Sequence, residues 1–340
     1  MIRVQNIYYM LSYAFQVLKD DNIASENFDC AEDLLAAILV KGITNQIKRG
    51  LGREYLCSED TLYSPHGKVN ISSSVKKLTF LKNQLICEFD ELSENVYINQ
   101  ILKTTMLILI RSEGVKQKQK TSLKKIFHYF HNVNVLNPHE IRWSSIRYHS
   151  NNSTYKMLMY ISYLVIEAMI PTHNEGSRKF LHFKDEYIYK LYERFVFEYY
   201  RKHYSVFKLS ASQIDWIVDD GFNDYLPTMN TDITLEYNGK TLIIDTKYYS
   251  QIFQNNYLSK NNTIRSGHLY QIYAYIKNKD IYHTGNVSGV LLYAKTENEY
   301  IQVSTYLMGG NKIGIKTLDL DKDFSHIKKQ LNTIVEEWLI

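Results

Sequence analysis

The sequence has few cysteines and no long apolar run, and both shortages exclude classes of protein. Its three cysteines, Cys30, Cys57 and Cys87, are widely spaced and form no Cys-x-x-Cys motif. This spacing argues against a disulfide framework and against a structural zinc site. No apolar run reaches the roughly 18 residues of a transmembrane helix, and the first residues lack the features of a secretory signal. The pattern predicts a cytoplasmic protein with no membrane association.

Two further shortages limit the nucleotide chemistry and the DNA binding expected of this chain. No G-x-x-x-x-G-K-[ST] motif occurs, and the glycine-rich segment 309–314 has the wrong spacing for one. The chain should therefore not hydrolyse nucleotides by itself. Forty Lys and Arg against 36 Asp and Glu give a formal net charge of +4, which is only mildly basic for a protein that grips DNA unaided. We expect another subunit to deliver any DNA substrate.

The densest basic cluster lies in a polar stretch between two predicted helical segments. It consists of Lys116, Lys118, Lys120, Lys124 and Lys125. These lysines could contact phosphates, but a solvated loop is the default interpretation. His128 and His131 have no cysteine nearby and are predicted to lie on a helix surface rather than to bind zinc.

A strong β-hairpin signal is present between residues 231 and 247. Its central Asn-Gly dipeptide favours a two-residue type I′ turn, which sets the register of both strands. Counting outward from this turn places Asp232 directly opposite Asp245. Because side chains alternate along a strand, Lys247 shares the face of Asp245. Apolar cross-strand neighbours cover the other face: Ile233, Leu235, Leu242 and Ile244.

The two opposed carboxylates need a compensating positive charge, because like charges facing each other across a strand pair are destabilising. Mg²⁺ takes carboxylate oxygens and keeps waters that can attack a phosphodiester. The Lys247 ammonium could orient or deprotonate such a water. We therefore predict Asp232 and Asp245 as metal ligands and Lys247 as a catalytic lysine, in the pattern of PD-(D/E)xK nucleases with Thr231 in place of the usual proline. The alternative is a surface hairpin with a weak ion pair.

Two predicted helices carry candidate supporting residues. The helix predicted from Gly267 to Ile276 places Gln271 and Tyr275 one turn apart on the same side, as in the Gln-x-x-x-Tyr helix of many nucleases of this group. The helix predicted at 185–203 carries Glu193, which could turn toward the site as an extra ligand or base. Both Gln271 and Glu193 could equally be ordinary helix-surface residues.

The order of predicted elements indicates two domains of an α+β protein. Residues 1–172 are predicted to form a helical partner-docking domain, with a β-rich finger inserted at about 49–89. A Pro- and Gly-containing break at 170–176 marks the boundary. Residues 173–340 should form a mixed sheet flanked by helices, of the PD-(D/E)xK, restriction-endonuclease-like α/β/α type. Further helices are predicted at residues 7–18, 31–46, 94–111, 155–169 and 327–338, and a further strand is predicted at residues 287–293.

Read from end to end, the sequence resembles the McrC family, the nuclease subunits of McrBC-type modification-dependent restriction systems. The matching segments are Asn6–Ala14, Leu191–Phe195, Thr231–Thr234, Ile244–Tyr249 and Leu269–Ile272. The resemblance implies an McrB-like AAA+ GTPase hexamer that recognises modified double-stranded DNA and delivers it. It also implies that the finger docks into the GTPase ring and stimulates GTP hydrolysis.

The same resemblance assigns residue roles and a function. It implies Asp232 and Asp245 as Mg²⁺ ligands, Lys247 as the catalytic lysine, and Glu193 and Gln271 as supporting residues. We therefore expect a Mg²⁺-dependent DNA endonuclease subunit. A non-catalytic adaptor of the motor is one alternative, and a stand-alone DNA repair nuclease is the other. The complete set of site residues argues against the first, and the modest net charge disfavours the second.

Overall fold

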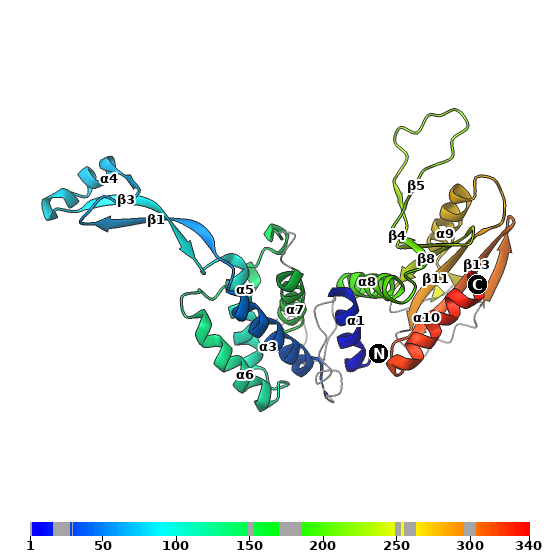
Figure 1. The fold of residues 1–340 in the computed structure, drawn as a ribbon, viewed down its shortest axis with the longest axis horizontal. Coiled ribbons are helices and arrows are strands. Elements are labelled where there is room, and N and C mark those ends of the chain that lie inside the picture. Colours follow the sequence, from blue (N-terminus) through cyan, green and yellow to red (C-terminus); the bar gives the residue numbers. More distant parts are fainter. Residues whose placement is uncertain are drawn as a thin grey trace. The chain divides into compact units, whose positions relative to one another are not determined.

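The structure, a computed structural model, divides into two compact units. It describes residues 2–15, 28, 30–148, 153–169, 185–248, 253–254, 263–295 and 304–340. Unit 1 comprises residues 1–31 and 179–340, and unit 2 comprises residues 32–178 (Figure 1). Among the described residues, no helix combines the length and the apolarity needed to cross a membrane.

The described residues of unit 1 form a six-stranded mixed sheet and four helices. The sheet strands are β4 (Lys208–Ser210), β7 (Ile233–Tyr237), β8 (Lys240–Lys247), β11 (Val287–Lys295), β12 (Ser304–Met308) and β13 (Asn311–Asp319). The helices are α1 (Val4–Phe15), α8 (Asp185–His203), α9 (Ser266–Lys279) and α10 (Phe324–Trp338). Two short strand pairs complete the unit: β5 (Gln213–Ile214) with β6 (Met229–Asn230), and β9 (Phe253–Gln254) with β10 (Thr263–Ile264).

The sheet is buried on both faces, as its near-continuous apolar central strands require. The strand order is β12-β13-β11-β8-β7-β4, and the three strands β13, β11 and β8 run parallel. On one face, Ile272 and Ile276 of α9 join a buried cluster with Leu291 of β11. On the other face, the Tyr192 hydroxyl of α8 donates to the Leu292 carbonyl, and α10 lies against β13. The α+β class predicted from the sequence is confirmed.

The register of the β7–β8 hairpin is the predicted one. Tyr237 pairs with Lys240, and the ladder continues to the pair of Ile233 with Ile244. The turn residues have positive φ angles, 48° at Asn238 and 76° at Gly239, as a type I′ turn requires. The ladder ends there, so Asp232 lies one position beyond the last paired residue of β7.

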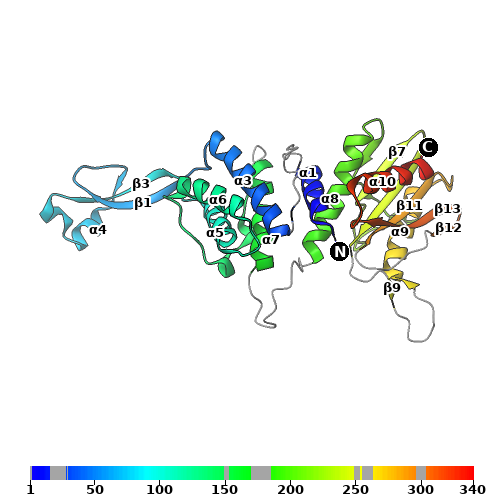
Figure 2. The ribbon, with the colours of Figure 1, turned by 90° about the horizontal axis from the view of Figure 1, so that it is seen from below.

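The first helix belongs to unit 1, which corrects the predicted division at residues 172 and 173. The Asn6 side-chain amide donates to the carbonyls of Leu320 and Lys322, at 2.7 and 2.8 Å. Tyr9 stacks on Phe324 of α10, with ring centroids 4.1 Å apart. Helix α1 also lies beside α8 (Figure 2). Its apolar stripe is therefore buried by elements more than 170 positions later in the chain, which spacing alone does not reveal. The predicted break at 170–176 lies outside the described residues.

Unit 2 combines helices with the predicted finger. Its helices are α3 (Ala31–Arg49, which begins at the unit boundary), α5 (Tyr97–Arg111), α6 (Gln117–Phe127), α7 (Ser153–Met169) and the short 3₁₀ turns η2 (His128–Phe130), η3 (Pro138–Glu140) and η4 (Trp143–Ser145). The finger contains β1 (Glu54–Leu62), β2 (Lys68–Val69), α4 (Ile71–Lys76), η1 (Thr79–Lys82) and β3 (Leu85–Ser93).

Within the predicted β-rich finger, only residues 68–69 of the segment 68–72 form a strand, because helix α4 begins at Ile71, where the Asn70 side chain accepts a hydrogen bond from the Ser73 amide as an N-cap. One local prediction in unit 2 is wrong. The lysine-rich stretch is helix α6 rather than a loop. Leu123 and Ile126 bury one side of α6, so the lysines occupy the solvated remainder of an amphipathic helix.

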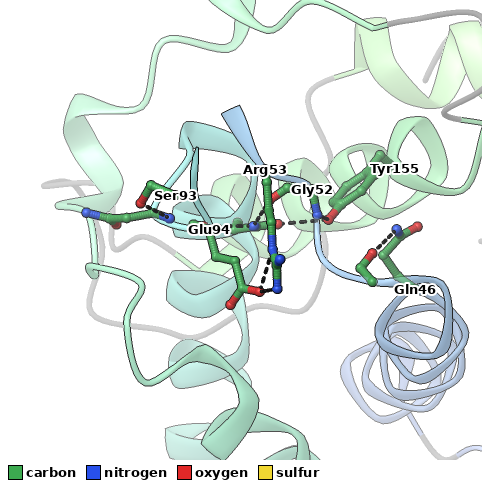
Figure 3. Close-up of polar contacts among 9 residues, drawn as sticks. Gln46, Gly52, Arg53, Ser93, Glu94 and Tyr155 are labelled. Atoms are coloured by element: carbon green, nitrogen blue, oxygen red, sulfur yellow. Dashed lines mark hydrogen bonds and ion pairs between the residues drawn. The ribbon is translucent and has the colours of Figure 1, made fainter. Parts of the chain in front are cut away.

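The finger is held at its base by a hydrogen-bonded network (Figure 3). The Tyr155 hydroxyl accepts from the Gly52 amide at 2.7 Å and donates to the Asn99 side chain at 2.9 Å. The Asn99 side-chain amide donates hydrogen bonds to the carbonyls of Gly52 and Glu94. Arg53 forms an ion pair with Glu94 at 2.6 Å. Both finger strands are therefore fixed to α5 and α7 where they leave the helical part of the unit.

The closest approach of α9 to the sheet occurs at Gly289 of β11. A Cβ atom placed there would lie 2.5 Å from Ile276 Cδ1 and 2.8 Å from Ile272 Cγ1. Both distances are shorter than van der Waals contact, so a side chain here would force the Ile272 and Ile276 side chains to shift. Gly289 therefore allows α9 to pack closely on β11.

We expect Gly289→Ala to lower the free energy of unfolding by about 1–3 kcal/mol, because the added methyl overpacks the core. The measurement is equilibrium urea unfolding. Gly267→Ala is the matched control, since a Cβ at that helical position meets nothing within 4 Å and should leave stability unchanged or slightly raised. Equal effects of the two substitutions would contradict the close approach.

The turn after α9 is fixed by the Asp280 carboxylate, which is 3% exposed. It accepts hydrogen bonds from the amides of Thr284 and Gly285, from the Thr284 hydroxyl and from the Asn311 side chain, at 2.7 to 2.9 Å. Burial raises the pKa of Asp280, but these donors outweigh burial and lower the pKa to about 2. The ionised carboxylate thus connects the end of α9 to the start of β13.

Asp280→Asn should lower the free energy of unfolding at pH 7 by about 1.5–3 kcal/mol, because hydrogen bonds to a charged acceptor are lost. The folded pKa lies below the unfolded value of about 3.9, so this stabilisation is present above about pH 4 and is lost as the pH falls toward 2. Urea unfolding across this range checks the prediction. A difference between the two proteins that stays constant down to pH 2 would contradict it.

Candidate metal centre

Asp245 and Lys247 lie at the end of β8, on the face that α9 covers. Asp245 is 0% exposed and Lys247 is 6% exposed. The sequence predicted an apolar face of the hairpin and an opposite face that carries Asp245 and Lys247. Ile243 lies on this second face, yet it also belongs to the core beneath α9. The site therefore lies in a low-dielectric environment, where charge interactions are stronger than in water.

The Asp245 carboxylate is only partly compensated. Its Oδ2 lies 2.6 Å from Lys247 Nζ in an ion pair, whereas its buried Oδ1 accepts no hydrogen bond from any described residue. The pKa of Asp245 is raised to about 6, mainly because the carboxyl is buried; Lys247 opposes this increase, and the nearby Asp232 carboxylate adds to it. A buried carboxylate oxygen without a donor is unusual, and a bound cation would satisfy it.

Asp232 reaches the same place from the other strand. Its Oδ2 accepts hydrogen bonds from the backbone amide and the hydroxyl of Thr246, both at 2.7 Å. The sequence predicted that Asp232 would face Asp245 within the ladder. In the structure, Asp232 instead contacts Thr246, the residue after Asp245. The carboxylates are close enough for the charge of Asp232 to raise the pKa of Asp245.

Gln271 of α9 contacts Lys247. Lys247 Nζ donates to Gln271 Oε1 at 3.0 Å, and Gln271 Nε2 donates to the Tyr275 hydroxyl at 2.7 Å. The Tyr275 hydroxyl donates in turn to the Asn230 carbonyl at 2.8 Å. This chain of hydrogen bonds holds the Lys247 ammonium between Asp245 and α9, and it orients the Gln271 amide.

Helix α8 brings Glu193 to the site together with Tyr189, which the sequence reasoning missed. The pKa of Glu193 is raised to about 7, mainly by burial and also by the charges of Asp232 and Asp245, while Lys190 and Lys247 oppose the increase. Burial likewise raises the pKa of Tyr189 well above its ordinary value, and the same carboxylates add to this while a hydrogen bond with Thr246 opposes it. The two residues are four apart, so one face of α8 carries both. That spacing was the available signal for Tyr189.

His268 is a second residue that sequence reasoning missed. Its Nδ1 lies 2.8 Å from the hydroxyl of Tyr293, which pairs with Lys247 across β11 and β8. The pKa of His268 is lowered to about 4, mainly by burial and also by the charges of Lys247 and Arg265. The imidazole is therefore neutral at neutral pH. Its position three residues before Gln271 on α9 places it on the same helix face.

The donor set fits a magnesium ion better than a zinc ion. Within the part of the chain that the structure describes, no group of three or more His, Cys, Asp and Glu side chains could hold a metal. Zinc sites use at least three such ligands, whereas Mg²⁺ binds through one or two carboxylates and keeps several waters. Asp232 and Asp245 are the residues that would hold it, and the Asp245 oxygen without a donor supports this assignment.

Comparison with known proteins places the chain in a family. A family model described as "McrBC 5-methylcytosine restriction system component" matches residues 4–294. This chain belongs to that family. A relative from Escherichia coli (strain K12), the "Type IV methyl-directed restriction enzyme EcoKMcrBC", is 26% identical over 347 residues, which cover 99% of this chain and 98% of the relative.

Solved structures match over most of the chain. The "Refined half-complex from tetradecameric assembly of Thermococcus gammatolerans McrB AAA+ hexamers with bound McrC" matches 97% of this chain and 76% of the other chain, with a TM-score of 0.52 and 15% identity. The "Cryo-EM structure of the Thermococcus gammatolerans McrBC complex" matches 57% and 56% of the two chains, with a TM-score of 0.42 and 17% identity. The first of these supports the fold of this family member.

We predict that Mg²⁺ raises the thermal unfolding temperature of this family member, because an ion held by Asp232 and Asp245 would bind the folded protein and would relieve the repulsion between the two carboxylates. At ten times the dissociation constant, the gain is about 1.4 kcal/mol. Differential scanning calorimetry with and without Mg²⁺ measures this shift. The shift should be lost in Asp245→Asn and retained in Asp321→Asn, which changes an exposed carboxylate after β13. A shift of the same size in Asp245→Asn would exclude this site as the metal centre.

Proposed function

We propose that this chain is the DNA endonuclease subunit of a McrBC-like, modification-dependent (type IV) restriction complex. The observation that carries the proposal is the convergence of Asp232, Asp245 and Lys247 at the end of β8. Gln271 and Glu193 reach the same place from two different helices. Membership of a restriction-system family supports the choice of DNA as the substrate.

The residues of the site have separate roles in this proposal. A bound Mg²⁺ would polarise the phosphate and supply an acidic water. Lys247, held by Asp245 and Gln271, places its positive charge where negative charge develops on the phosphate. Glu193 has a pKa of about 7, which suits a group that takes a proton from the attacking water near neutral pH. The burial of Asp245 and Lys247 strengthens these interactions.

The proposed partner is an McrB-like AAA+ GTPase hexamer, which delivers double-stranded DNA. The solved complex contains "McrB AAA+ hexamers with bound McrC", and this chain has no phosphate-binding motif of its own. The finger is the proposed docking element and GTPase stimulator. Its distal part leaves apolar side chains in solvent, with Ile71 69% and Leu81 71% exposed, and such surfaces mark protein contacts.

Asp245→Ala or Lys247→Ala should lower DNA cleavage by the reconstituted complex at least about a hundredfold, since charge stabilisation at the phosphate is lost. Stimulation of the partner's GTPase should remain, because the finger is unchanged. Gel-based cleavage and phosphate release measure the two activities on the same samples. Lys322→Ala, at an exposed position of unit 1, is the control and should retain both.

The same assays separate the alternatives. One rival is a non-catalytic adaptor of the motor. That rival predicts restriction unaffected by Asp245→Ala but abolished when the finger is deleted. Cleavage of DNA by the purified chain with Mg²⁺ alone would instead indicate a stand-alone nuclease. Either result would refute the proposal.

A further inference from the structure

Unit 1 carries a protruding hairpin that leaves large apolar side chains in solvent. Residues 215–228, which we name the acidic arm, extend beyond β5 and β6 (Figure 1). Every residue from 219 to 228 is exposed. Tyr225 is 100% exposed, Phe222 62% and Ile217 47%. Apolar side chains gathered in this way on an ordered segment indicate a binding surface.

The base of the acidic arm is fixed to the core of unit 1. Ile214 and Met229 of β5 and β6 are each 5% exposed and belong to the cluster beneath α9. Across the arm, the Trp216 indole N–H donates to the Pro227 carbonyl at 2.6 Å. The Ile217 amide donates to the Asn278 side chain of α9 at 2.8 Å. An anchored arm presents its apolar side chains with little entropy left to lose on binding.

The charge of the arm indicates the chemistry of its partner. The arm carries four aspartates, at positions 215, 219, 220 and 224, and no Lys or Arg occurs between Lys208 and Lys240. None of these aspartates forms an ion pair with a residue that the structure describes. Such a surface repels the phosphates of nucleic acid. It complements a protein surface with Lys and Arg around an apolar pocket, since aromatic anchors and opposite charges are typical of specific interfaces.

We propose that the acidic arm docks onto a basic surface with an apolar pocket on the AAA+ partner, as a contact separate from the finger. The identity of the partner rests on the proposed function, whereas the chemistry of its surface rests on the arm. A chain of hydrogen bonds connects the base of the arm to the proposed catalytic residues. The Asn230 carbonyl of β6 accepts from the Tyr275 hydroxyl, which accepts from Gln271, and Gln271 accepts from Lys247. We therefore expect docking of the arm to change the position of Lys247.

Two arm variants test the proposal against the AAA+ partner assembled with a non-hydrolysable GTP analogue. Phe222→Ser/Tyr225→Ser removes apolar anchors, and Asp219→Asn/Asp220→Asn/Asp224→Asn removes charge while keeping hydrogen-bond acceptors. The first should raise the Kd for the partner roughly tenfold, as loss of interface anchors does. The second should lower the association rate and its salt dependence.

At saturating partner, GTPase stimulation through the finger should be retained in both arm variants while DNA cleavage falls. The control is Tyr282→Ser/Leu307→Ser, which removes side chains that are 87% and 79% exposed outside the arm and should leave Kd and cleavage unchanged. Thermal unfolding of all variants should match that of the unsubstituted chain, because the substituted side chains are solvent-exposed.

An unchanged Kd in both arm variants would overturn the proposal, as would a change confined to self-association of the chain in sedimentation, which would identify a second copy as the occupant. Faster DNA cleavage after the aspartates are removed would also overturn it, because the arm would then only repel DNA. Failure of the proposed function has a different signature, because it shows in the unsubstituted arm: DNA cleavage would then be insensitive to Asp245→Ala or would occur without the partner.

Discussion

The candidate site of unit 1 depends on one buried electrostatic contact, the Asp245–Lys247 ion pair at the end of β8. Removing two charges from water is costly, and their mutual attraction offsets this cost only when further partners are present. Lys247 has such a partner in Gln271, but one oxygen of Asp245 has none among the described residues. The asymmetry leaves the site short of positive charge, which is the property expected of a metal centre.

The remainder of the unit holds this contact in place. Gly289 lets α9 approach the sheet closely enough for Gln271 to reach Lys247. Asp280 fixes the turn that follows α9. Helix α8 closes the other face and directs Glu193 toward the carboxylates. A site assembled from strands and helices that are packed in this way is positioned more rigidly than one assembled from loops.

The two units present different surfaces for partners. The finger of unit 2 ends in apolar side chains and is fixed at its base through Tyr155 and Asn99. The acidic arm of unit 1 combines apolar and acidic side chains and is fixed at its base through Ile214 and Met229. Both elements pair a rigid base with an exposed apolar tip, which suits recognition of a protein more than of a phosphate backbone.

Local rules alone determined the hairpin register, most of the helices and the candidate residues, because the Asn-Gly turn and apolar periodicity act over a few neighbouring residues. Only the tertiary structure decided that α9 covers Asp245, that α8 turns Glu193 inward, that Asp232 contacts Thr246, and that α1 joins the C-terminal unit through Asn6. These outcomes depend on contacts between segments far apart in the chain. Burial, and with it the electrostatics of the site, exists only once those segments pack together.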